Sequence, residues 1–188
     1  MTEPKRFIFL AAVIASASLS FMLWSLISDR SAILENGSEI LLKTQPIDPR
    51  DLLRGRYVRL DFEAETIPAS DADRFDLPEG ESFFNDDAFV RFEPGNSGFH
   101  EVAELSIGKP DDLSGWMAVR FSRFPSNREI RFYFPVDRYY TNEKIAPELE
   151  RRMREGALTE VVLALWNGDA QIKSFRQDGE TVLVEPLF

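Results

Sequence analysis

One stretch near the N terminus restricts the fold of this chain more than any other feature. Residues 7–27 form an uncharged apolar run of 21 residues, FIFLAAVIASASLSFMLWSLI. As a helix rising about 1.5 Å per residue, the run covers about 30 Å, the thickness of the hydrocarbon core of a bilayer. Trp24 lies in its last turn, where an indole ring can rest among lipid headgroups. The run therefore predicts a single transmembrane anchor.

The orientation of this anchor follows from its flanks. Lys5 and Arg6 precede the run while Arg30 and Lys43 follow it, so the basic residues alone give little preference. The tail before the run is very short, however, and a long domain translocates largely regardless of its charge. We expect a cytoplasmic tail at 1–6, the anchor at 7–27, a polar stalk at 28–38 and an extracytoplasmic domain at 39–188.

A cleaved signal peptide is the competing interpretation of the same run. Residues 15–17, Ala-Ser-Ala, have the small-x-small form of a signal peptidase site. Cleavage there would leave the apolar stretch 18–27 as the N terminus of a soluble protein, which is unfavourable. The length of the run thus favours a retained anchor over a cleaved signal.

The rest of the chain is strongly acidic. The protein has 22 Lys and Arg against 32 Asp and Glu, a net charge of −10, and residues 28–188 carry 20 basic and 31 acidic side chains. This field repels phosphate backbones, so nucleic acid is not an expected partner. The absence of Cys and the single histidine, His100, exclude disulfides, thiolate nucleophiles and Cys or multi-histidine metal sites. We expect no metal and no cofactor.

Short segments with alternating apolar residues follow the anchor and predict strands. Residues 159–166, TEVVLALW, are nearly all apolar and indicate a central strand, and Asn167-Gly168 and Asp178-Gly179 predict tight hairpin turns that make residues 159–185 a three-stranded meander. The remaining predicted strands are residues 40–44, 56–67, 88–92, 99–107, 116–124 and 129–134.

One helix is expected among the strands. Pro147 fits its first position and Gly156 the residue just past its end, with acidic residues leading and basic residues trailing. About nine short strands and one short helix predict a mainly β domain, an antiparallel β-sandwich or barrel, with two small β subdomains divided near 108–115 as an alternative.

The densest polar stretch is residues 48–62, DPRDLLRGRYVRLDF. It resembles the signature of the GDYXXLXY family of bacterial membrane-anchored proteins: Gly55, Tyr57 and Leu60 match, as does the leading DPRDL. Two positions depart, Arg56 where the family has Asp and Phe62 where it has Tyr.

A second stretch, VDRYY at 136–140, is similar to the family's Ile-Glu-Arg-Tyr-Tyr/Phe stretch, and the charged segment after it is similar to the charged helix that follows in the family. The resemblance covers the whole chain. It implies a protein that is anchored in the bacterial inner membrane and accompanies a multi-pass membrane protein, and it brings no catalytic residues.

These two stretches supply the candidate binding residues. Tyr and Arg are enriched where proteins bind partners, although second-layer packing of the aromatic side chains is the alternative. Trp116 and Tyr133 could likewise belong to a binding surface or to second-layer packing. The candidates for contact with a partner are Asp48, Arg50, Asp51, Gly55, Tyr57, Arg59, Arg138, Tyr139 and Tyr140.

Several catalytic and metal-binding hypotheses can be weighed on the residues. The stretch 48–62 loosely resembles the active-site turn of type I signal peptidases, but no serine lies between Ser38 and Ser70 to act as nucleophile. A Ca²⁺ site at Asp48, Asp51 and Asp61 is disfavoured by the arginines among them.

We expect His100 to face outward near Glu104, without a catalytic role. A hydrolase acting on envelope sugar polymers through paired carboxylates such as Asp51 and Asp137 stays open. So does a passive structural spacer. A non-catalytic binding or accessory module agrees best with the residues present.

Overall fold

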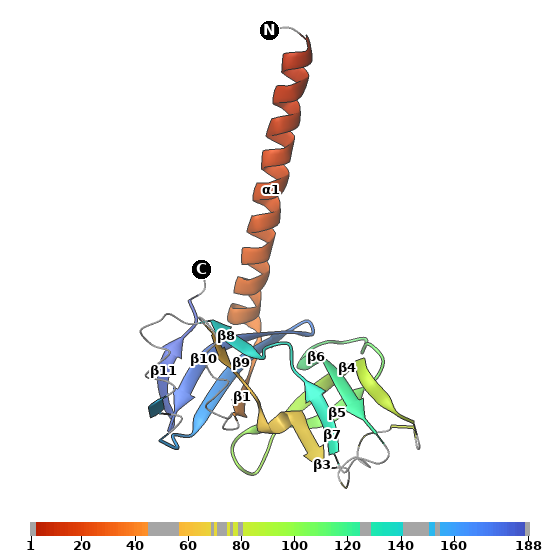
Figure 1. The fold of residues 1–188 in the computed structure, drawn as a ribbon, viewed down its shortest axis with the longest axis vertical. Helices are drawn as coiled ribbons and strands as arrows, with labels where there is room; N and C mark the ends of the chain where they lie inside the picture. The colour runs from red at the N-terminus through yellow and green to blue at the C-terminus, as the bar shows by residue number, and fades with distance from the viewer. Residues whose placement is uncertain are drawn as a thin grey trace.

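A computed structural model describes residues 3–44, 57–68, 70, 75, 77–78, 81–124, 129–140, 151–152 and 155–186. One long helix, α1 (Glu3–Asn36), extends away from a β domain, and its N-terminal end lies far from that domain (Figure 1). Within α1 the stretch Phe7–Asn36 is apolar enough, and the helix long enough, to cross a membrane. The domain is mainly β, as the sequence predicts.

The first sheet has four antiparallel strands in the order β1-β9-β10-β11. The apolar segment predicted to be central, β9, indeed lies between β1 and β10, and β10 and β11 complete the predicted meander. Positive φ angles at Asn167 (53°) and Gly168 (90°) and at Asp178 (52°) and Gly179 (81°) are those of the two predicted hairpin turns. The strands are β1 (Ser38–Lys43), β9 (Thr159–Trp166), β10 (Asp169–Gln177) and β11 (Glu180–Val184).

The second sheet has five strands in the order β3-β7-β6-β4-β5, again antiparallel. Its strand β7 shows the predicted alternation, because Ile130 and Phe132 are buried while Arg131 and Tyr133 are exposed. The strands are β3 (Thr66–Pro68), β4 (Phe83–Pro94), β5 (His100–Ser106), β6 (Trp116–Arg123) and β7 (Glu129–Tyr133).

The long strand predicted over 56–67 is wrong, because three short elements replace it. They are β2 (Tyr57–Arg59), the 3₁₀ turn η1 (Glu63–Glu65) and β3. The Glu65 carboxylate accepts a hydrogen bond from the backbone N–H of Phe62 at 3.0 Å, and the Glu65 N–H donates back to the Phe62 carbonyl at 3.0 Å. These paired bonds close a turn where the alternation of side chains alone predicts a continuous strand.

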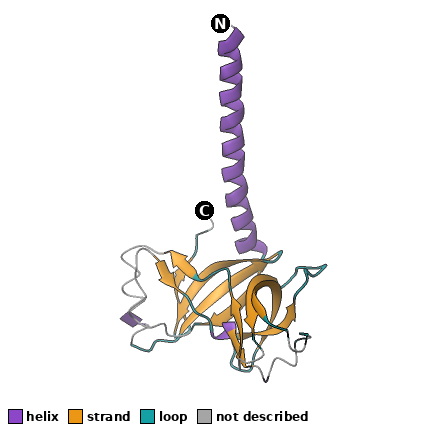
Figure 2. Cartoon of the chain, turned by 45° about the vertical axis from the view of Figure 1, so that its right-hand side comes forward, coloured by secondary structure: helices purple, strands orange, loops and turns teal. Residues whose placement is uncertain are grey.

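Both sheets contribute to one hydrophobic cluster. Phe62, Phe121, Phe132 and Phe175, each no more than 1% exposed, belong to this cluster together with the inward residues of β9. The hairpin turn at Gly168 also pairs with Met117 of β6, where the Ala118 N–H donates to the Gly168 carbonyl at 2.8 Å. The two sheets therefore share a core (Figure 2).

The helix predicted from Pro147 falls mostly outside the described residues. Arg151 and Arg152 are helical, and the Ala157 N–H donates to the Arg152 carbonyl at 3.0 Å across Gly156, whose φ is +91°. This bond and this φ are those of a glycine directly after a helix end, as predicted for Gly156.

The stalk predicted over 28–38 is helical instead, because α1 continues to Asn36 and β1 starts at Ser38. Ile33 and Leu34 are 7% and 2% exposed, since the end of α1 packs against β9 and β10. Beneath it, Ala164 is fully buried on the face of β9 opposite to the core residues Leu163 and Leu165. The helix joins the domain through packing and not through a polar loop.

Replacing Gly37 with alanine should disrupt this junction. A Cβ at position 37 would lie 2.4 Å from the Ile33 carbonyl oxygen and 3.0 Å from backbone atoms of Leu165, none of which can move independently. We expect Gly37→Ala to lower the free energy of unfolding by about 1–3 kcal/mol, measured by urea unfolding of the detergent-solubilised protein.

Gly108→Ala is the matched control, because its Cβ would meet nothing within 4 Å. It should be neutral or slightly stabilising, as the loss of glycine restricts the unfolded chain. Equal stability of the two variants would contradict the close packing at Gly37.

Candidate functional site

The two stretches selected from the sequence meet in a two-stranded ribbon. Strand β2 pairs antiparallel with β8 (Arg138–Tyr140), in the register Tyr57 to Tyr140 and Arg59 to Arg138. A further backbone bond, from the Leu60 N–H to the Asp137 carbonyl at 2.8 Å, continues the pairing. Seventy-three residues, 63–135, separate the two stretches, so neither stretch alone predicts this pairing.

The described part of the chain covers the candidates unevenly. Asp48, Arg50, Asp51 and Gly55 lie outside the described residues, as do the side chains of Tyr57, Arg59 and Tyr140. The Arg138 side chain is 54% exposed and its Nε lies 3.5 Å from the Asp137 carboxylate. Arg138 is therefore a candidate whose charged group is accessible from solvent.

Tyr139 points into the domain. It is 6% exposed, and its ring centroid lies 4.6 Å from that of Phe175 on β10. Its hydroxyl donates a hydrogen bond to Glu185 Oε2 at 2.9 Å, and burial raises the pKa of this hydroxyl while the nearby Arg30 charge opposes the rise. Tyr139 thus fixes β8 to the first sheet, in the manner of second-layer packing.

Glu185 accepts from two different elements. One carboxylate oxygen accepts from the Tyr139 hydroxyl, and the other pairs with the Arg30 guanidinium near the end of α1. The Glu185 N–H also donates to the Lys173 carbonyl at 2.9 Å, which ties the residue to β10. A single carboxylate therefore connects the long helix, the ribbon and the first sheet.

A second carboxyl, Glu65, is buried where the ribbon meets the second sheet. Its Oε1 and Oε2 accept from the N–H groups of Phe134 and Phe62, each at 3.0 Å. Burial raises the pKa of Glu65 to about 7, and the neighbouring Asp61 carboxyl adds to the rise while the two backbone bonds oppose it. Both oxygens accept hydrogen bonds from backbone N–H groups, so Glu65 has a structural role.

Asp61, Glu65 and Asp137 line a cavity of about 300 Å³ together with Arg131. Of the carboxylate pair considered for a hydrolase, Asp137 lies here and Asp51 lies outside the described residues. In the described part of the chain, no group of three or more His, Asp or Glu side chains is arranged to hold a metal ion.

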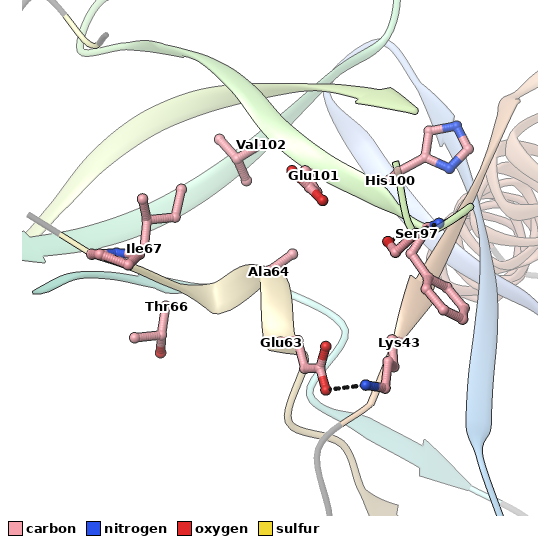
Figure 3. A pocket seen from close by; sticks show the side chains of 11 residues that line it. Lys43, Glu63, Ala64, Thr66, Ile67, Ser97, His100, Glu101 and Val102 are labelled. Carbon is pink, nitrogen blue, oxygen red and sulfur yellow. Dashed lines mark hydrogen bonds and ion pairs between the residues drawn. The ribbon is translucent and has the colours of Figure 1, made fainter. Parts of the chain in front are cut away.

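The expectation that His100 faces outward near Glu104 is wrong. Its Nδ1 accepts a hydrogen bond from the Leu41 N–H at 3.1 Å, which links β5 to β1 across the two sheets, while Glu104 pairs with Arg91 instead. His100 lines a cavity of about 290 Å³ in which Lys43 and Glu63 form an ion pair at 2.6 Å (Figure 3). His100, Lys43 and Glu63 thus each connect different secondary-structure elements of the domain.

Trp116 lies on β6, and Tyr133 lies on β7, where it lines the same cavity as Leu60 and Asp137 beside the ribbon. Each ring has an arginine guanidinium above it, Arg91 over Trp116 at 5.7 Å and Arg131 over Tyr133 at 5.8 Å. Their side chains therefore do not form one surface with Tyr139.

Sequence reasoning missed Glu185, Arg30 and Glu65. Arg30 and Glu185 are 155 positions apart, and no local pattern relates them. For Glu65 one signal exists, because it follows the aromatic Phe62 by three residues, the spacing at which a carboxylate can cap a turn.

The pKa of Glu65 predicts a pH dependence of stability. Because its folded-state pKa of about 7 exceeds the ordinary 4.5, Glu65 contributes stability that is fully present below pH 4.5 and lost as the pH rises through about 7. We expect the difference in free energy of unfolding between the wild type and Glu65→Gln to shrink over this interval, measured by urea unfolding at several pH values. A difference that grows with pH would contradict the assignment. Glu129→Gln, exposed on β7, is the control.

The shared Glu185 carboxylate predicts coupling between helix and ribbon. Tyr139→Phe should lower the free energy of unfolding by about 1–2 kcal/mol, because it leaves a part-buried carboxylate with one donor fewer. In a double-mutant cycle with Arg30→Gln, the two effects should not add. Additive effects would show that the Arg30 and Tyr139 bonds to Glu185 are independent, and Tyr133→Phe, whose ring is 43% exposed, serves as the control.

Comparison with known proteins agrees with the resemblance seen in the motifs. No curated protein and no solved structure matches this chain. The family model described as "GDYXXLXY protein" matches residues 19–175, which include most of the chain, the ribbon and nine of the eleven strands in full. This chain belongs to the GDYXXLXY family.

Proposed function

We propose that this protein is a membrane-anchored, non-catalytic accessory module that docks onto a multi-pass membrane protein through its β2-β8 ribbon and the adjoining residues 48–61. The observation that supports the proposal is the backbone pairing of β2 with β8, which brings the described parts of the two signature stretches side by side. Figure 1 places β8 at the base of α1, the part of the domain nearest to a membrane that α1 would cross.

The proposed topology is a single pass through the bacterial inner membrane with the N terminus inside and the β domain extracytoplasmic. Support comes from the apolar stretch within α1 and from the absence of any charged residue between Phe7 and Ile27. Because α1 runs without a break to Asn36 and packs on the domain, the ribbon would be held at a fixed height above the bilayer.

The two described side chains of the ribbon, Arg138 and Tyr139, support a binding role. The Tyr139 hydroxyl is engaged with Glu185, and Arg138 lies beside Asp137. An exposed arginine on a short strand pair is typical of a contact surface, since Arg is enriched at binding hot spots.

A pull-down from detergent extracts tests this function. We expect the wild type to co-purify a multi-pass membrane protein and the double variant Tyr57→Ala, Arg138→Ala to lose it by about tenfold or more, as hot-spot truncations cost about 2 kcal/mol or more. The readout is quantitative mass spectrometry of the co-purified proteins, with equal amounts of folded bait.

Arg120→Ala is the matched control, because Arg120 is an exposed arginine on β6 of the second sheet. It should retain the partner. The same proteins in all three samples, or loss with the control as well, would count against docking through the ribbon.

A further inference from the structure

The two edge strands of the second sheet face each other across a cavity. In the order β3-β7-β6-β4-β5, β3 and β5 lie at opposite edges, and in the described part of the chain each pairs with one neighbour only. Both strands nevertheless line the cavity of about 290 Å³ that also contains His100, β3 through residues 66–68 and β5 through residues 100–102. The sheet is therefore curled like a barrel that is open between β3 and β5, and we call this opening the β3–β5 cavity.

The directions of the strands show what kind of strand would complete this barrel. Each neighbouring pair in the sheet is antiparallel, and four such pairs connect β3 to β5. The two edge strands therefore run in the same direction. A barrel whose strands are all antiparallel needs an even number of them, which five strands do not provide. One further strand, running opposite to both edges, would pair antiparallel with each of them.

The side of the β3–β5 cavity that faces the core is apolar. Ile67 of β3 and Val102 of β5 are both buried members of the hydrophobic cluster and both line the cavity. Figure 3 shows the two side chains on their separate strands, beside Ala64 of η1. The volume of the cavity is far above the space that one water needs, so the side chains of the two edges leave it unfilled.

The outer rim of the β3–β5 cavity is acidic. Glu101 lines the cavity, and its register partner on β4 is Glu93, so two exposed carboxylates lie opposite each other on neighbouring strands. Like charges in this arrangement destabilise a sheet. Within the described residues neither carboxylate forms an ion pair, and the cation Lys43, which also lines the cavity, is already paired with Glu63. A cation placed beside Glu101 would therefore relieve the repulsion.

We propose that a protein partner adds an extended basic segment to the β3–β5 cavity as a sixth strand. The segment runs antiparallel to β3 and β5 and bonds to their backbones, as in other cases of strand addition to a sheet edge. Every second side chain is apolar and faces Ile67 and Val102, and the side chains between them are Lys or Arg and face Glu101 and Glu93. This surface is separate from the ribbon, and the inference depends neither on docking through the ribbon nor on the membrane crossing of α1.

Peptide binding to the full-length protein in an uncharged detergent tests the proposal. The probe is a capped octapeptide of alternating Lys and Val. One comparison peptide has Glu in place of Lys, and the other has N-methyl groups on alternate backbone nitrogens, which remove the donors toward one of the two edges. We expect the Lys peptide to bind about tenfold or more tightly than either comparison peptide, measured by isothermal titration calorimetry.

Glu101→Gln is the informative variant, because Glu101 is exposed and lines the β3–β5 cavity. It should weaken binding of the Lys peptide by about threefold or more. Glu180→Gln, an exposed carboxylate on β11 of the first sheet, is the matched control and should bind as the wild type does. Bound Lys peptide should also slow hydrogen exchange of the β5 amides, measured by mass spectrometry. Equal melting temperatures would show that both variants are folded.

Four results would overturn the sixth strand. They are binding of the Lys peptide no tighter than that of the Glu peptide, equal binding of the N-methylated peptide, unchanged binding by Glu101→Gln, and unchanged hydrogen exchange in β5 when the peptide is bound. A wild type that binds the Lys peptide at β5 but co-purifies no membrane protein would reject the function proposed for the ribbon and leave the sixth strand standing, so the two proposals fail separately.

Discussion

The close packing of the end of α1 on β9 determines how the rest of this molecule is arranged. Gly37 permits it, because no side chain fits between Ile33 and the backbone of Leu165, and Ala164 leaves room beneath the helix. A bulky residue at either position would separate helix and sheet, and the chain would need a linker. With this packing the apolar helix and the β domain form one continuous body.

The packing of the helix on the domain determines where the ribbon lies relative to α1. Two bonds to Glu185, from Arg30 of α1 and from Tyr139 of β8, hold the ribbon against the base of the helix. The Tyr139 ring adds apolar contact with Phe175. A surface held in this way loses little conformational entropy when a partner binds, which is the advantage of a preorganised site.

The sequence predicts those parts of the fold in which the local pattern and the tertiary environment agree. In β7 and β9 the pattern of apolar residues in the sequence matches the pattern of buried residues in the structure. The Asn-Gly and Asp-Gly pairs specify turns with positive φ. The strand prediction fails between Arg59 and Thr66, where the Glu65 side chain interrupts the alternation by binding the backbone. The stalk prediction fails because the buried residues Ile33 and Leu34 form only a short apolar segment in a polar stretch, and this segment is too short to predict packing.

The candidate site is predictable only in part, for a related reason. Motif resemblance identifies both stretches that form the ribbon, but it does not predict that residues 138–140 are a strand or which of their side chains point outward. Tyr139 is adjacent to the exposed Arg138 in sequence but faces the core, because successive residues of a strand alternate. Long-range partners such as Arg30 and Glu185 leave no trace in either local sequence.

One consequence of the shared carboxylate concerns how α1 and the ribbon affect each other. If the Arg30 bond to Glu185 is broken, the same carboxylate is free to alter its bond to Tyr139 and hence the position of β8. Coupling of this kind is reciprocal in free energy, so a change at the Tyr139 bond would affect the Arg30 bond by the same amount.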